Sequence, residues 1–187
     1  VQTAELADGE ARFSMLETIR EYAAERLDTA GEGGAARERH ASYFLALAEE
    51  AEPHFARPER EEWHRRLERD AANLRAALAW FSTPGAIPEA SHQPGSVETP
   101  EGSDATDRHM RGLRMASALG WFWLSRGYLI EGRRWLDEFL AKVGRQGGGV
   151  ARARGLYTAG LLAWALGDLA SADGPVGECQ GLFIIIE

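Results

Sequence analysis

This sequence of 187 residues has a single cysteine, fewer basic than acidic residues and no long apolar run. Its single cysteine, Cys179, cannot form a disulfide within the chain, which favours a reducing, cytoplasmic setting. The net charge of −8 has the wrong sign for a nucleic-acid-binding surface, and Arg and Glu interleave without a segregated basic patch. No apolar run is long enough to span a membrane. We therefore expect neither direct nucleic-acid contact nor a membrane partner.

The start of the chain also lacks familiar features. The first residues have neither the basic start nor the apolar core of a signal peptide. Because the chain does not begin with Met, we expect it to be a piece of a longer polypeptide.

The patterns that accompany catalysis or metal binding are missing as well. The glycine-rich stretches 31–34 and 144–149 lack the Lys and the Ser or Thr of a phosphate-binding loop. The five histidines are scattered, and no His–His or Cys–His pair has ligand spacing. We therefore expect no cofactor, no metal site and no enzymatic activity.

One weak alternative comes from the enzyme class. His64 and Glu68 lie four residues apart, next to Trp63, on a predicted helix. Such a group would suit a helical domain that processes a small molecule, but no catalytic constellation supports it. A surface pair on one turn of a helix explains His64 and Glu68 better.

A pattern that occurs twice, forty residues apart, organises the second half of the chain. The matching positions are Gly120 with Gly160, Gly127 with Gly167, and Leu129 with Leu169. Each copy is an apolar helical run that ends in glycine and leads into a second stretch. Paired helices of this spacing must lean on their neighbours to bury their apolar faces. The sequence therefore predicts an all-α fold of tetratricopeptide-like antiparallel helical hairpins.

The N-terminal part has a different periodicity. Asp8-Gly9 between residues 1–6 and 11–16 predicts a short β-hairpin. From Glu17 the apolar residues take helical spacing, at Ile19, Ala23 and Leu27, and Gly31 is expected to end this helix.

Further helices are predicted from apolar stripes. Their approximate ranges are 35–52, 58–81, 108–127, 128–143 and 150–166. The stripe of the first of these includes Tyr43, and Leu166 belongs to the stripe of the last. Tryptophans at helical spacing, among them Trp121 and Trp164, are expected in the core. Residues 82–107 contain four of the seven prolines and predict a flexible insertion.

Five segments carry a resemblance to a known family. They are residues 12–27, 39–44, 67–78, 132–136 and 163–168, with sequences RFSMLETIREYAAERL, RHASYF, LERDAANLRAAL, GRRWL and AWALGD. In this order they resemble bacterial STAND-type signal-transduction ATPases, the regulators that include the maltose-type and AfsR-type activators and many LuxR-family transcriptional regulators. No single motif is decisive, but together they cover most of the chain outside 82–107 and the tail.

The resemblance implies a regulatory arm that senses an inducer or a partner protein. The ATPase module and the DNA-reading helix-turn-helix of such proteins would lie elsewhere in the parent polypeptide. The division that it implies is a winged-helix end at 1–30, a helical pair at 31–82, an insertion at 83–107, tetratricopeptide-like repeats at 108–173 and an irregular tail at 174–187.

Two functions follow as alternatives. In the first, the chain binds a partner protein or an inducer on the concave face of its repeats. The expected contact residues on that face are Arg114, Ser117, Trp121, Arg154 and Tyr157. In the second, the chain is a structural scaffold that only spaces other domains of the parent polypeptide.

Overall fold

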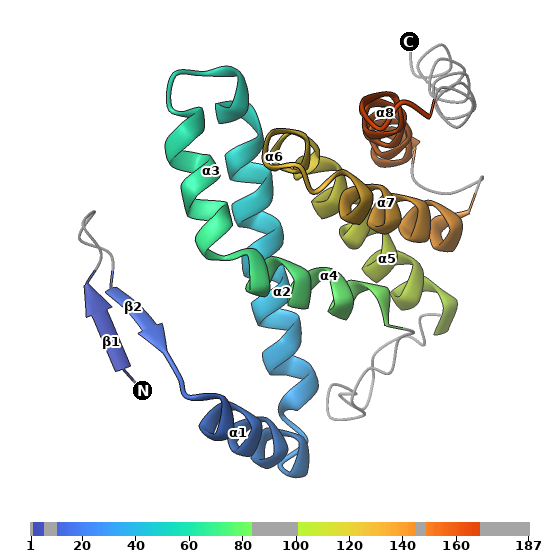
Figure 1. Cartoon of the computed structure of the whole chain (residues 1–187). Helices are drawn as coiled ribbons and strands as arrows, with labels where there is room; N and C mark the ends of the chain where they lie inside the picture. Colours follow the sequence, from blue (N-terminus) through green and yellow to red (C-terminus); the bar gives the residue numbers. More distant parts are fainter. Residues whose placement is uncertain (1, 6–10, 84–100, 145–148, 169–187) are drawn as a thin grey trace.

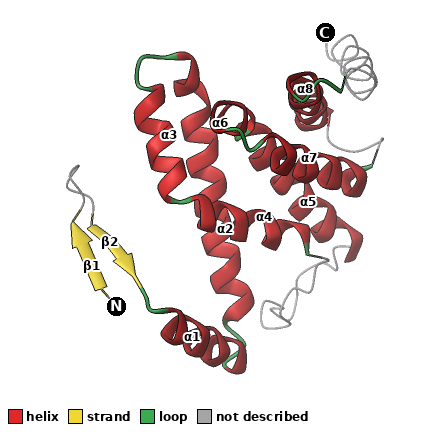
Figure 2. Ribbon diagram, viewed as in Figure 1, coloured by secondary structure: helices red, strands yellow, loops and turns green. Residues whose placement is uncertain are grey.

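The computed structural model describes residues 2–5, 11–83, 101–144 and 149–168. In chain order its elements are β1 (Gln2–Glu5), β2 (Ala11–Ser14), α1 (Glu17–Thr29), α2 (Gly33–Ala51), the 3-10 helix η1 (Glu52–Ala56), α3 (Arg60–Arg69), α4 (Ala71–Ser82), α5 (Glu101–Ala118), α6 (Gly120–Arg126), α7 (Leu129–Val143) and α8 (Gly149–Ala165). The fold is all-α with one N-terminal β-hairpin, as the sequence predicts (Figures 1 and 2). None of the described helices is long and apolar enough to cross a membrane.

The N-terminal arm comprises the hairpin and α1. Strands β1 and β2 pair antiparallel, with Gln2 opposite Ser14 and Glu5 opposite Ala11. The predicted Asp8-Gly9 turn lies outside the described residues. Figure 1 shows the hairpin at one edge, with α1 beyond it at the foot of α2.

Helix α1 ends as predicted at a glycine. Gly31 has a φ of +73°, a left-handed conformation that glycine adopts without strain. The amide of Glu32 donates to the carbonyl of Leu27 at 2.8 Å, which closes the last turn. The predicted apolar stripe is only partly covered, because Ile19 remains exposed while Leu27 is half-buried.

The helix predicted over 58–81 is two helices, α3 and α4, separated at Asp70. The backbone of Asp70 leaves the helical region, with φ −102° and ψ 13°. Its carboxylate accepts a hydrogen bond from Asn73 Nδ2 at 3.0 Å. An aspartate can bond to groups near the start of a helix in this way, which favours a break at that point. Leu67 and Leu74, on either side of the break, are nevertheless buried as predicted.

Helix α5 begins at Glu101, within the range predicted as an insertion. Residues 101–107 contain no proline, so the composition that breaks helices ends before this segment. The rest of the predicted insertion, 84–100, lies outside the described residues. The run predicted over 108–127 is also divided, because Leu119 (φ −80°, ψ 0°) separates α5 from α6.

The forty-residue pattern is visible in the hydrogen bonds. Gly127 and Gly167 both have left-handed φ values, +79° and +78°. The amide of Tyr128 donates to the carbonyl of Trp123, and that of Asp168 to Ala163, each at 3.0 Å. The two runs therefore end in the same way, forty residues apart, as the sequence predicts. The residues after Asp168, including the predicted tail at 174–187, lie outside the described residues.

Glycines let the helices α5, α6, α7 and α8 approach one another closely. A Cβ on Gly112 would lie 2.2 Å from the ring of Phe139, and one on Gly132 would lie 2.3 Å from the ring of Trp123. A Cβ on Gly155 would lie 2.6 Å from Leu113. These side chains occupy the space that a larger residue would need, so the helices interlock through rings seated on glycine.

Arg152 fixes the joint between α7 and α8. Its side chain is buried and its Nη1 donates to the carbonyls of Leu140 at 3.0 Å and Gly144 at 2.8 Å. These carbonyls belong to the end of α7, where cations are favourable.

Several residues predicted to be in the core are exposed instead. They are Ile19, Tyr43, Trp121, Trp164 and Leu166. Each lies on an apolar helical stripe, and such a stripe predicts which side of a helix is apolar without showing that another element covers it. The neighbours Phe122 and Trp123 are buried, so only part of the predicted apolar end of α6 faces inward.

Candidate functional site

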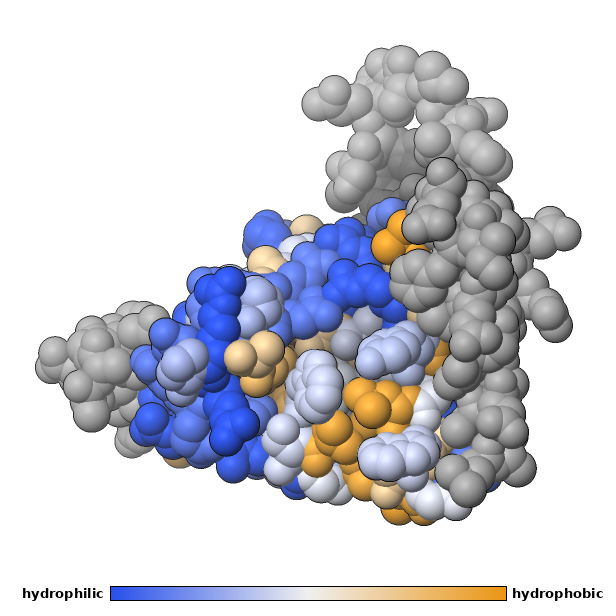
Figure 3. All heavy atoms as spheres, turned by 90° about the horizontal axis from the view of Figure 1, so that it is seen from above, coloured by the Kyte–Doolittle hydropathy of each residue, from blue (hydrophilic) through white to orange (hydrophobic). Residues whose placement is uncertain are grey.

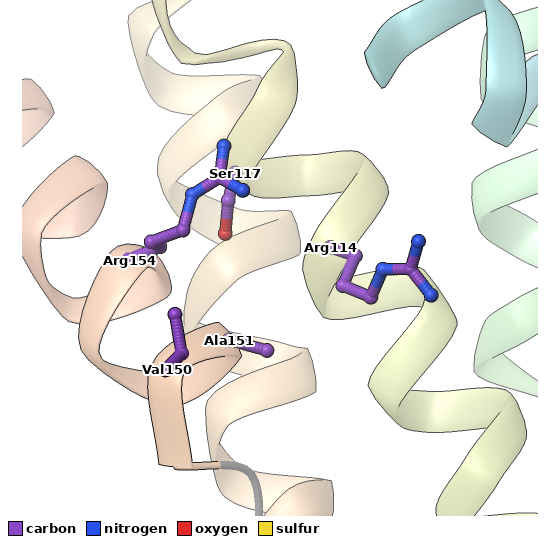
Figure 4. A pocket seen from close by; sticks show the side chains of 5 residues that line it. All are labelled: Arg114, Ser117, Val150, Ala151 and Arg154. Atoms are coloured by element: carbon purple, nitrogen blue, oxygen red, sulfur yellow. The ribbon is translucent and has the colours of Figure 1, made fainter. Parts of the chain in front are cut away.

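A pocket of about 230 Å³ lies between α5 and α8. It is lined by Arg114 and Ser117 of α5 and by Val150, Ala151 and Arg154 of α8. In Figure 4 the guanidinium of Arg154 extends over Ser117, whereas that of Arg114 extends away from α8. The pocket thus has an apolar wall at the start of α8 and two cations at its rim.

Carboxylates near the end of α2 hold both arginines. Arg114 donates through Nε to Glu49 Oε1 at 2.8 Å, and its Nη2 lies 2.6 Å from the same oxygen in an ion pair. Arg154 donates to Glu52 of η1 through Nη2. Both pairs are partly exposed, so they contribute little stability, and their main effect is to position the two cations.

A close approach between α6 and α8 lies beyond the pocket. A Cβ on Gly120 would lie 2.5 Å from Thr158 Cγ2, so α6 and α8 meet there with almost no space between them. Ser117 and Arg154 are neighbours in the pocket, and Gly120 and Thr158 are neighbours one turn further on. The segment 114–121 and α8 therefore run side by side in the same direction.

Helix α8 is buried on every side but one. Within 150–164, the residues that are not buried are Val150, Ala151, Arg154, Tyr157, Leu161 and Trp164. Leaving out Ala151, which is half-buried, these positions are spaced by four, three, four and three residues. This is the spacing at which one helix presents a straight seam to another. We call Val150, Arg154, Tyr157, Leu161 and Trp164 the α8 seam.

The α8 seam continues across the pocket onto α5 and α6. Forty residues earlier, Arg154, Tyr157 and Leu161 correspond to Arg114, Ser117 and Trp121. We call the α8 seam together with these three residues the two-helix face. Figure 3 shows a surface on which apolar residues gather on one side and hydrophilic residues on the other. Trp121, Tyr157 and Trp164 are 48%, 55% and 64% exposed, unusually high values for large aromatic side chains.

All five predicted contact residues belong to this face. Three of them, Arg114, Ser117 and Arg154, line the pocket, whereas Trp121 and Tyr157 lie outside it. Ser117 is buried and donates to the carbonyl of Leu113 at 2.7 Å, so its hydroxyl is engaged within α5. That these residues contact a ligand remains a prediction.

Sequence reasoning missed the other members of the face. Trp164 was expected to lie in the core, and no role was predicted for Val150 or Leu161. Their spacing together with Arg154 was the available signal, because a charged residue on an apolar stripe indicates that the stripe is not fully buried.

The enzyme alternative finds little support in the geometry around His64. The imidazole is 6% exposed and stacks on Phe55, with 5.0 Å between ring centroids. It is therefore a buried residue and does not form the predicted surface pair with Glu68. Burial lowers the pKa of His64, and the nearby Arg126 lowers it further. Its nearest carboxylate is Glu61, at 3.8 Å from Nδ1.

The other two members of that alternative are engaged elsewhere. Tyr128 donates its hydroxyl proton to Glu68 at 2.5 Å. Trp63 stacks on His54 at 4.8 Å, and Arg66 lies over its ring at 5.0 Å. Among the described residues, no three His, Cys, Asp or Glu side chains are grouped so that they could hold a metal ion.

A helical fold with one exposed aromatic and cationic face is typical of proteins that recognise other molecules by surface contact. Over 132 residues, 71% of this chain, the sequence is 33% identical to a protein of Mycobacterium bovis named "Putative HTH-type transcriptional regulator". It matches proteins of the same description from two strains of Mycobacterium tuberculosis to the same extent. The chain spans 12% of the length of these relatives. No protein-family model matches the chain, and no solved structure matches it significantly.

Proposed function

We propose that this chain is a non-catalytic recognition module of a helix-turn-helix transcriptional regulator. It binds a partner protein or an inducer on the two-helix face. The observation that carries the proposal is the exposure of Trp121, Tyr157 and Trp164 beside two arginines, together with the burial of the other sides of α8. Exposed aromatic and arginine side chains are the residue types that contribute most to binding energy at interfaces.

Similarity to named transcriptional regulators supports the proposal that this module is part of such a regulator. The relatives are called transcriptional regulators, and the matched stretch is a small part of their length. We place DNA contact in another part of the parent polypeptide. In this chain Arg114, Arg126 and Arg154 are each paired with a carboxylate, and the net charge is −8.

A finer assignment follows from the resemblance of residues 12–27 and the later segments to STAND-type ATPases. In that assignment the helical hairpins are tetratricopeptide-like and belong to a cytoplasmic LuxR-family regulator. Binding at the two-helix face would be relayed to the ATPase domain of the same polypeptide. The recognition proposal does not depend on this assignment.

A reporter gene under the control of the parent regulator tests the proposal against the scaffold alternative. The double substitution Tyr157→Ala and Trp164→Ala removes two exposed rings without creating a core cavity. We expect it to change reporter output by about tenfold, because truncating such anchors commonly weakens binding by that factor or more. The matched control is Ile130→Ala on α7, where an apolar side chain is 76% exposed away from the face. Unchanged output from a folded double variant would favour the scaffold.

A further inference from the structure

We infer that the two-helix face binds one amphipathic α-helix of a partner protein, and that this helix places a carboxylate against Arg154. The inference rests on the proposed function and specifies the occupant of the same site. Three observations carry it: the spacing of the α8 seam, its narrowness, and the single charge within it.

The spacing selects a helix as the occupant. Val150, Arg154, Tyr157, Leu161 and Trp164 follow one another at intervals of four and three residues. On an α-helix this interval keeps successive side chains on one nearly straight line. An extended peptide presents side chains with a period of two and would not match this line. A second helix, crossing at a shallow angle, can interdigitate along its whole length.

The narrowness limits the occupant to a single element. The other residues of α8 are already buried, because α8 packs against α7, α5 and α6. Examples are Arg152, Ala153, Leu156 and Thr158. The uncovered part of α8 is therefore about one side chain wide. Trp121 lies along the neighbouring wall and would flank the bound helix.

The charge of Arg154 determines which side chain the bound helix must place beside it. A helix that covers the seam removes Arg154 from water, and each of its N–H donors then needs an acceptor. The bond to Glu52 uses Nη2, and among the described residues no bond uses Nε or Nη1. A carboxylate is the acceptor that fits a guanidinium best, because the pair is charge-assisted and can be bidentate. The pocket beside Arg154, with Val150 and Ala151 as its wall, has room for such a side chain.

Other charges facing this point are balanced. Glu52 neutralises Arg154, and Glu49 neutralises Arg114 on the opposite rim. A partner carboxylate would thus join Arg154 as a second acceptor, with Arg114 as the next nearest cation on the rim. A partner lysine at the same place cannot accept a hydrogen bond, so it would leave the Nε and Nη1 donors of Arg154 without acceptors.

Synthetic helical peptides test the inference on the 187-residue chain. Each peptide has about three heptads with leucine at the a and d positions. One end of the leucine stripe carries Glu, Gln or Lys, and a fourth peptide has the same composition in scrambled order. Binding is measured by fluorescence anisotropy. We expect the Glu peptide to bind at least about tenfold tighter than the Lys peptide, and the scrambled peptide not to bind.

Substitutions at Arg154 decide whether this preference has the stated cause. Arg154→Glu should reverse the preference, so that the Lys peptide binds tighter. Arg154→Gln avoids a new repulsion with Glu52 and should make the Glu and Lys peptides bind alike. Trp164→Ala should weaken all ordered peptides by about tenfold, and Ile130→Ala should not. Far-UV circular dichroism and melting curves establish that each variant is folded.

Several results would overturn the inference. One is equal binding of the Glu and Lys peptides to the unsubstituted chain; another is a preference that persists in folded Arg154→Gln. Self-association of the chain that Trp164→Ala abolishes, seen by sedimentation, would show that a second copy is the occupant. Peptides without charge preference, together with a reporter that responds to the face substitutions, would reject the helix and leave the proposed function standing. A silent reporter would reject both.

Discussion

Helix α1 and helix α7 both have an apolar stripe, weaker on α1, and their surroundings are very different. On α7 the inward residues Trp135, Leu136 and Phe139 are buried against α5 and α8. On α1 the corresponding stripe leaves Ile19 49% exposed, and the preceding Leu16 is 66% exposed. The comparison shows that helical periodicity predicts the apolar side of a helix equally well in both places. Among the described elements α7 packs against both α5 and α8, whereas α1 packs mainly against α2, so we expect α7 to contribute more to stability.

The largest expected loss of stability comes from a substitution on α7, the helix that its neighbours cover. Phe139 sits on Gly112 and stacks on Trp135 with 6.0 Å between centroids. Phe139→Ala removes a fully buried ring and should lower the free energy of unfolding by about 3–5 kcal/mol. Urea denaturation followed by circular dichroism measures it. A loss below about 1 kcal/mol would mean that α7 is no better packed than α1.

A second substitution tests the close approach of α7 to α6 at Gly132. In Gly132→Ala the new Cβ would lie 2.3 Å from the ring of buried Trp123. Alanine favours helix by about 1 kcal/mol over glycine, so an uncrowded site would be stabilised. We expect a net loss of about 1–2 kcal/mol instead, because overpacking outweighs the propensity. The control is Ile130→Ala on the same helix, which should remain within about 0.5 kcal/mol. Stabilisation by Gly132→Ala would show that the ring yields easily.

The stability of the helices outside the N-terminal arm should depend on pH through two histidines, the buried His64 of α3 and the half-buried His109 of α5. Burial lowers the pKa of both His64 and His109, so these imidazoles bind a proton less readily in the folded chain than in the unfolded chain. Between about pH 7.5 and about pH 5.5 the unfolded chain then binds more protons, and stability falls as the pH falls. Near His64, Arg126 adds to this effect and Glu61 opposes it.

Melting temperatures across that pH range measure the effect. His64→Phe removes the titrating group and retains a ring that can stack on Phe55, so its melting temperature should change less with pH than that of the unsubstituted chain. An equal slope in both proteins would show that His64 does not titrate in this range.

The smallest expected effect lies on the arm. Ile19→Ser removes an exposed apolar side chain from α1 and should change the free energy of unfolding by less than about 0.5 kcal/mol. Denaturation curves of the two proteins should then nearly coincide. A clear loss of stability would mean that another part of the molecule covers Ile19.

Local features of the fold were predictable because they depend on neighbouring residues alone. Glycine at 31, 127 and 167 takes the left-handed conformation that ends a helix, as its lack of a side chain suggests. The breaks at Asp70 and Leu119 were not predicted, because apolar stripes run through both positions without interruption. At Asp70 the local signal was the aspartate itself, whose carboxylate accepts a hydrogen bond from Asn73 at the start of α4.

The candidate site was predictable in part for a similar reason. Arg114 and Arg154 are a repeat apart, so the forty-residue pattern placed both on the same side of their helices. Trp164 was assigned to the core, because its residue type and spacing are those of core tryptophans. Which side of α8 stays uncovered depends on the positions of α5, α6 and α7, and these are properties of the assembled fold.

The buried guanidinium of Arg152 has a consequence for how this region can vary. By bonding the last carbonyls of α7, it attaches α8 to α7 directly and independently of the polypeptide that links them. Residues could be added to or removed from that link without tilting either helix. We therefore expect changes of length in this link to leave the packing of α8 on α7 unchanged.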